Sequence, residues 1–98
     1  MKSRDEVLKI LTSQKSSLLE DYQITRLGIF GPYARDQQTE ASDLDVLVDY
    51  HQPLTLPRLI DLRDELSEMV EMKVDVVTPN GLKPTKRDRA LSEVIYLE

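Results

Sequence analysis

The chain of 98 residues fits one small domain, and its net charge of −5 argues against non-specific binding to nucleic acid, which depends on a positive surface potential. It contains no cysteine, so disulfide bonds and thiolate metal sites are excluded. No apolar run approaches the ~20 residues that cross a membrane, and the N-terminal segment lacks the apolar centre of a signal peptide. We therefore expect a cytoplasmic protein with one domain over residues 1–98 and no membrane partner.

The pattern of apolar residues predicts helices and strands in the order helix, strand, strand, helix, strand, helix. A Ser3–Glu6 capping box begins the first helix, and β-branched and aliphatic runs are typical of the strands. The predicted elements are a helix over 3–22, a strand over 24–30, a short helical turn over 32–37, a strand over 43–50, a helix over 56–72, a strand over 73–78, a helix over 86–94 and a strand or tail over 95–98. This order predicts one α/β domain with a short sheet.

Two acidic residues share one face of the second predicted strand. Side chains alternate along a strand, so Asp43 and Asp45 point to one face while the apolar Leu44, Val46 and Val48 point to the other. Like charges ~4 Å apart repel by roughly 1 kcal/mol in water and about 4 kcal/mol at an intermediate effective dielectric. A cation between the two carboxylates removes this repulsion, and paired carboxylates are common ligands of Mg²⁺.

A third carboxylate stands alone in the next predicted strand. Asp75 is flanked by valines, where an unpaired charge is costly if it is buried. If the two strands are neighbours, three carboxylates could hold two cations, the arrangement that clamps the attacking and leaving oxygens in nucleotidyl transfer. An Asp-x-Asp pair by itself is more often a solvated strand end, and we assign Asp49 to that class as an exposed residue without a site role.

Taken together, these residues resemble the nucleotidyltransferase superfamily of DNA polymerase β. That family's motif is Gly-Ser, about ten residues, Asp-x-Asp and a later acidic residue; here Gly31–Pro32 is followed by ten residues, the pair and Asp75. The segments 33–35, 42–48, 74–78 and 82–84 are similar to the minimal nucleotidyltransferase (MNT) branch. The resemblance extends from about residue 24 to the end of the chain.

The resemblance implies a nucleotidyltransferase fold, a short mixed β-sheet flanked by helices, with Mg²⁺ and ATP at its edge. By motif position, the catalytic and metal-binding residues would be Asp43, Asp45 and Asp75, with two Mg²⁺ ions, and Asp75 could help to deprotonate the acceptor hydroxyl. The nucleotide-binding positions would be Gly31, Pro32, Arg35 and Ser42. A structural ion pair is slightly favoured for Arg35, and a loop-capping role for Ser42 is as well supported as a substrate contact.

Two residues depart from the family's pattern. Pro32 replaces the serine that offers a hydroxyl and a backbone N–H to the triphosphate, and proline offers neither. Each lost donor would cost on the order of 1–3 kcal/mol if nothing replaces it. Asp36 stands where glycine is common and adds negative charge near the phosphates.

The resemblance also implies a biological role. MNT proteins are typically antitoxins of HEPN RNase toxins, and some transfer AMP from ATP to a tyrosine of the toxin. We expect this activity here, with no direct binding of nucleic acid. Two alternatives stay open: a catalytically degenerate antitoxin that neutralises the toxin by binding only, and an enzyme that modifies a small molecule such as an aminoglycoside.

Two surface features have more ordinary explanations. Exposed leucines on the first or third helix could form a surface for the partner or for a homo-oligomer. A basic cluster near the last helix is read as a solvated helical face rather than as a site that steers ATP. The cluster consists of Lys83, Lys86, Arg87 and Arg89.

Overall fold

The helices and strands follow one another along the chain in the predicted order. The computed structural model describes residues 1–98. Its elements are α1 (Arg4–Ser13), α2 (Lys15–Tyr22), β1 (Ile24–Phe30), β2 (Leu44–Tyr50), α3 (Leu56–Val70), β3 (Val74–Val77), a 3-10 helix (Pro79–Gly81), α4 (Pro84–Glu93) and β4 (Ile95–Tyr96). Each predicted strand is present, and the main differences concern helix boundaries.

The first predicted helix is divided in two. The capping box is confirmed, because the Ser3 hydroxyl accepts from the Glu6 N–H at 3.1 Å and the Glu6 carboxylate accepts from the Ser3 N–H at 3.3 Å. The prediction of one helix over 3–22 was wrong, since Gln14 leaves helical geometry between α1 and α2. The break falls in a run of threonine, serine and glutamine, and the Ser13 hydroxyl donates to the Ile10 carbonyl at 2.6 Å, a local bond that competes with the helix.

The four strands form one mixed sheet in the order β3-β2-β1-β4. The central strand β1 is antiparallel to both of its neighbours, β2 and β4, and β2 is parallel to β3. Parallel neighbours require a crossover, which α3 provides between β2 and β3. This topology confirms the predicted mixed sheet flanked by helices, and it makes the two acid-bearing strands neighbours.

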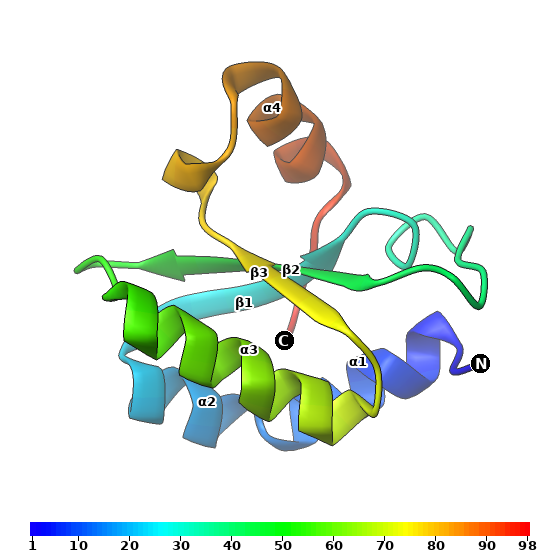
Figure 1. Cartoon of the computed structure of the whole chain (residues 1–98), viewed down its shortest axis with the longest axis horizontal. Coiled ribbons are helices and arrows are strands. Elements are labelled where there is room, and N and C mark those ends of the chain that lie inside the picture. Colours follow the sequence, from blue (N-terminus) through cyan, green and yellow to red (C-terminus); the bar gives the residue numbers. More distant parts are fainter.

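Helices cover the two faces of the sheet unequally. Figure 1 shows α1, α2 and α3 together against one face and α4 alone against the other. The first face carries the main core, to which β2 contributes Leu44, Val46 and Val48. On the opposite face Leu47 is fully buried, and Ala90 is the one buried residue of α4. The two faces of β2 therefore separate the apolar core from the side that carries Asp45.

The surface prediction for the first and third helices is half supported. On α3 the side chains of Leu56 and Ile60 are 69% and 39% exposed, whereas no leucine of α1 is largely exposed. Of the two helices named in the prediction, only the third therefore carries largely exposed apolar side chains, at its start; Leu91 on α4 is also exposed, at 45%. None of the helices combines the length and apolarity that crossing a lipid bilayer would require.

Candidate active site

The sheet register brings the predicted carboxylates to one edge of the molecule. In the parallel pairing of β2 with β3, Asp45 lies directly opposite Asp75. Asp43 immediately precedes β2, and its carboxylate lies 3.7 Å from the Nζ of Lys73, which immediately precedes β3. Adjacency of the two strands, on which the three-carboxylate hypothesis depended, is therefore confirmed.

The three carboxylates differ in exposure. Asp45 and Asp43 are half-buried, and Asp75 is exposed on an edge strand. Water can reach the exposed carboxylate of Asp75, so its charge carries no desolvation cost that a cation would have to relieve. What links Asp75 to the site is its register with Asp45.

Electrostatic repulsion is concentrated on the middle carboxylate. Burial, followed by the charges of Asp75 and Asp43, raises the pKa of Asp45 to about 6, although the nearby charge of Arg35 acts in the opposite direction. Burial and like charges both disfavour the ionised form. A cation placed among these groups would reverse the shift.

The donor set fits Mg²⁺ in its chemistry. Hard carboxylate oxygens from adjacent strands, with a backbone approach for phosphates beside them, are the ligands that this ion takes together with substrate and water. In this structure no three acidic or histidine side chains converge on a single point. Full coordination therefore requires side-chain rotation or the phosphate oxygens of a bound nucleotide.

Gly31 packs directly against the middle carboxylate. Its φ of +74° lies in the left-handed region, and an added Cβ would collide with the Oδ2 of Asp45. Both the backbone angle and the missing side chain thus require glycine at this position. The Gly31 N–H donates to Glu93 Oε1 at 3.0 Å.

Residues 32–36 form consecutive turns rather than a helix. The N–H of Arg35 donates to the Gly31 carbonyl at 3.2 Å, and that of Gln37 to the Pro32 carbonyl at 2.9 Å. Asp36 adopts φ +57°, the angle that the family's more common glycine would adopt without strain. Pro32 therefore removes a backbone donor and a hydroxyl from this turn, and Asp36 adds a negative charge to it.

Arg35 makes the ion pair that was favoured for it. Its Nη1 donates to Glu93 Oε2 at 2.8 Å, and its Nε donates to Gln37 at 3.3 Å. The guanidinium also lies close enough to Asp45 for its charge to act against the rise in the pKa of that carboxyl. Arg35 therefore forms a structural ion pair and also lies beside the candidate carboxylate site.

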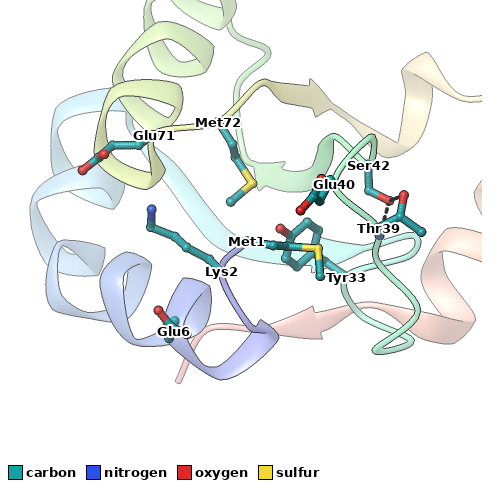
Figure 2. Close-up of a pocket in the computed structure, with 9 residues that line it drawn as sticks. All are labelled: Met1, Lys2, Glu6, Tyr33, Thr39, Glu40, Ser42, Glu71 and Met72. Carbon is teal, nitrogen blue, oxygen red and sulfur yellow. Dashed lines mark hydrogen bonds between the residues drawn. The ribbon is translucent and has the colours of Figure 1, made fainter.

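Ser42 caps its own loop, the first of the two roles considered for it. Its hydroxyl accepts from the Thr39 N–H at 2.9 Å, and its own N–H donates to the Thr39 carbonyl at 3.0 Å. It lines a pocket of about 520 Å³, in which Figure 2 shows Thr39 and Ser42 on one side and Lys2 and Glu71 on the other. None of the three site aspartates lines this pocket.

A smaller pocket of about 260 Å³ lies against the Gly31 turn, although none of the three aspartates lines it either. It is lined by Gly31 and Arg35 and, from α4, by Lys86, Arg89 and Glu93. Lys86 and Arg89 are exposed, as a solvated helical face predicts, yet they also place two cations beside the glycine turn. The concentration of cations makes this pocket the better candidate for an anionic ligand.

Sequence reasoning missed Glu93 and misjudged Asp49. Glu93 is 62 positions from the glycine that it contacts, so no local pattern could reveal the contact. Asp49 was expected to be exposed but is half-buried and lies 2.7 Å from Arg26 on the neighbouring strand. Its lack of a site role agrees with that pairing, and only the strand register could show the partner.

Comparison with known proteins gives the family. The family profile described as a nucleotidyltransferase domain matches residues 11–97. The candidate protein adenylyltransferase MJ0126 of Methanocaldococcus jannaschii is 41% identical over 98 residues, covering 99% of this chain and 100% of the relative. Protein adenylyltransferase MntA of Thermococcus cleftensis is 34% identical over 97 residues, covering 99% of this chain and 98% of the relative.

Solved structures share the fold. A candidate minimal nucleotidyltransferase superposes with a TM-score of 0.72 at 32% identity, covering 90% of this chain and 93% of the other. A toxin–antitoxin structure with AMP-PNP superposes with a TM-score of 0.75 at 20% identity, covering 89% of this chain and 72% of the other, and at that identity shows the fold alone. The chain therefore belongs to the nucleotidyltransferase domain family, as a minimal nucleotidyltransferase of the DNA polymerase β-like superfamily.

Proposed function

We propose that this protein transfers AMP from ATP to a tyrosine of a HEPN-domain toxin and thereby acts as its antitoxin. The observation that carries the proposal is the register of Asp45 with Asp75 beside the Gly31 turn. Support comes from relatives named protein adenylyltransferases. A similar fold also occurs in a solved structure described as a tri-AMPylated Shewanella oneidensis HEPN toxin in complex with MNT antitoxin. The matched chain superposes with a TM-score of 0.69 at 17% identity, covering 93% of this chain and 71% of that chain.

Five of the predicted site residues have roles in this proposal. Asp43, Asp45 and Asp75 would hold Mg²⁺, which would supply positive charge to neutralise the phosphates. Gly31 lets the backbone lie close to the phosphates, and Arg35 offers its remaining nitrogen to them. The tyrosine oxygen attacks the α-phosphorus, the bond to pyrophosphate breaks, and the tyrosine proton passes to Asp75.

The proposal is tested by mass spectrometry. The protein is incubated with ATP, Mg²⁺ and its cognate HEPN-domain toxin, and the intact toxin is weighed. We expect the mass gain of one or more AMP groups, which disappears in the double variant Asp43→Asn with Asp45→Asn. The control Asp49→Asn removes a carboxylate from the same strand outside the site and should retain activity, since a partly exposed ion pair contributes only ~0–1 kcal/mol. An unmodified partner, with a known adenylyltransferase active in the same buffer, would contradict the catalytic role.

A binding-only antitoxin is the second candidate, and a specific observation favours it. Pro32 removes two donors, and the Gly31 N–H is already bound to Glu93, so few backbone donors face a triphosphate. This candidate predicts that the double aspartate variant still protects cells that express the toxin. Loss of protection while the two proteins still co-purify would exclude it.

A further inference from the structure

Glu93 joins two parts of the candidate site that are distant in sequence. It lies at the end of α4, on the sheet face opposite the main core, and its side chain is 17% exposed. Its two oxygens have different partners: Oε1 accepts from the Gly31 N–H at 3.0 Å, and Oε2 accepts from Arg35 Nη1 at 2.8 Å. A single carboxylate thus holds the glycine turn and the arginine in one arrangement.

The bond to Arg35 orients the guanidinium. Glu93 takes Nη1 and Gln37 takes Nε, and Nη2 makes no hydrogen bond within the protein. The Arg35 side chain is only 30% exposed and lies on the wall of the 260 Å³ pocket with Lys86 and Arg89. A guanidinium held at two nitrogens presents its third in a fixed direction, which lowers the entropic cost of binding a phosphate.

The bond to Gly31 supports the carboxylate site. The glycine backbone rests against the carboxylate of Asp45, with no room for a Cβ between them. By holding this backbone, Glu93 limits where the Asp45 side chain can lie. Burial alone would raise the pKa of Glu93, but hydrogen bonds from Arg35 and Gly31 outweigh it, and the pKa is lowered. The carboxylate is therefore stabilised in its charged form by the groups that it holds.

We propose that Glu93 is a positioning residue that fixes Arg35 and the Gly31 backbone for the phosphates of the bound nucleotide. The inference rests on the proposed function for the identity of the ligand. It assigns to the C-terminal helix a part in organising the nucleotide site. Residues that orient ligand-binding groups commonly contribute 10–100-fold to affinity or activity (~1.4–2.7 kcal/mol).

The test measures the Kd of AMP-PNP with Mg²⁺ by isothermal titration calorimetry. We expect Glu93→Ala to weaken binding ~10–100-fold. Glu93→Gln should weaken it less, because its amide oxygen can still accept one of the two bonds. The matched control Asp88→Asn removes an exposed carboxylate from the same helix and should change the Kd less than about twofold.

A double-mutant cycle tests whether Glu93 acts through Arg35. Glu93→Ala should cost less in an Arg35→Gln background than in the wild type, because part of its effect has already been lost. Equal or tighter binding in both Glu93 variants would overturn the proposal, since it would mean that the carboxylate competes with phosphate for Gly31 and Arg35. If Glu93→Ala fails to fold, the Kd of Glu93→Gln decides. Weaker binding than in the wild type supports the proposal, and equal or tighter binding overturns it.

Nuclear magnetic resonance of the free protein separates this inference from the proposed function. If the wild type binds no AMP-PNP, the proposed function is contradicted. The positioning role of Glu93 is then tested by the spectra of the ligand-free protein. We expect sharp Arg35 Nη1–H signals and a slowly exchanging Gly31 amide in the wild type and in Asp88→Asn, because Glu93 accepts from both groups. Both should be lost in Glu93→Ala. Unchanged signals would overturn the positioning role.

Discussion

Asp45 is the residue of the candidate site that burial and neighbouring charges affect most. Its carboxylate is half-buried, faces Asp75 across the sheet and touches the Gly31 backbone. In the metal-free protein these surroundings oppose its charge and raise its pKa from 3.8 to about 6. A charge held at a cost in stability is a common property of functional sites.

The raised pKa of Asp45 predicts that the stability of the protein depends on pH. Between about pH 4 and 6 the folded state holds a proton on Asp45 that the unfolded chain has released, so the free energy of unfolding falls as pH rises. Asp45→Asn should therefore stabilise the metal-free protein at pH 7 by ~1–2 kcal/mol, and the gain should vanish toward pH 4. Urea unfolding of both proteins across this range measures the difference. A gain independent of pH would contradict the assignment.

Gly31 gives a second prediction at the scale of one residue. Gly31→Ala should destabilise the protein by ~2–4 kcal/mol, because it combines a left-handed backbone angle with a collision against Asp45. Gly81→Ala is the matched control, since its Cβ would meet only the Thr78 hydroxyl at 3.2 Å and its φ is not positive. Thermal unfolding of the two variants should separate them clearly; similar losses would show that Gly31 is not a special position.

At the scale of elements, two helices end without glycine. Gln23 after α2 and Glu71 after α3 both adopt φ +54°. Glycine is the usual residue in this conformation, because other residues have a Cβ that crowds the carbonyl. The missing glycine also explains why the third helix was predicted to reach residue 72 when it ends at Val70.

Replacing Glu71, the residue that follows α3, tests whether its left-handed backbone angle is strained. Glu71→Gly should stabilise the protein by ~0.5–1 kcal/mol, because it relieves the left-handed strain at α3's end. Glu68→Gly, at an exposed position in the last turn of the same helix, should instead destabilise it by up to about 1 kcal/mol. Chemical denaturation of the two variants gives the signs, and the same sign for both would refute the role of the backbone angle.

At the scale of the whole molecule, the two sheet faces are unequally stabilised. Three helices share the main core on one face, and α3 alone buries Leu62, Leu66 and Val70. On the other face α4 buries only Ala90, and its end is tied to the sheet through Glu93. Elements with few buried apolar side chains open more readily than the core.

Hydrogen exchange should show this difference directly. Amides of α4 should exchange at least ~10-fold faster than those of β1 and β2, through local opening rather than global unfolding. Adding AMP-PNP with Mg²⁺ should slow exchange in α4, since its basic residues and Glu93 border the pocket beside Gly31. Uniform exchange across both faces would contradict a weakly docked helix.

Much of the fold was predictable from the sequence because its determinants are local. The Ser3 capping box, the aliphatic run of β1 and the alternation of Asp45 with valines depend on residues within a few positions of one another. The break at Gln14 and the left-handed helix ends were not predictable, because no proline or glycine marks them.

The sequence by itself determined the residue types of the site, the spacing of Gly31 from the aspartate pair and the family to which this pattern belongs. Only the tertiary structure decided that Asp75 lies opposite Asp45, that Asp49 pairs with Arg26, and that Glu93 binds Gly31 and Arg35. Strand register and the docking of α4 set these contacts. They join residues far apart in the chain, where spacing alone carries no information about distance in space.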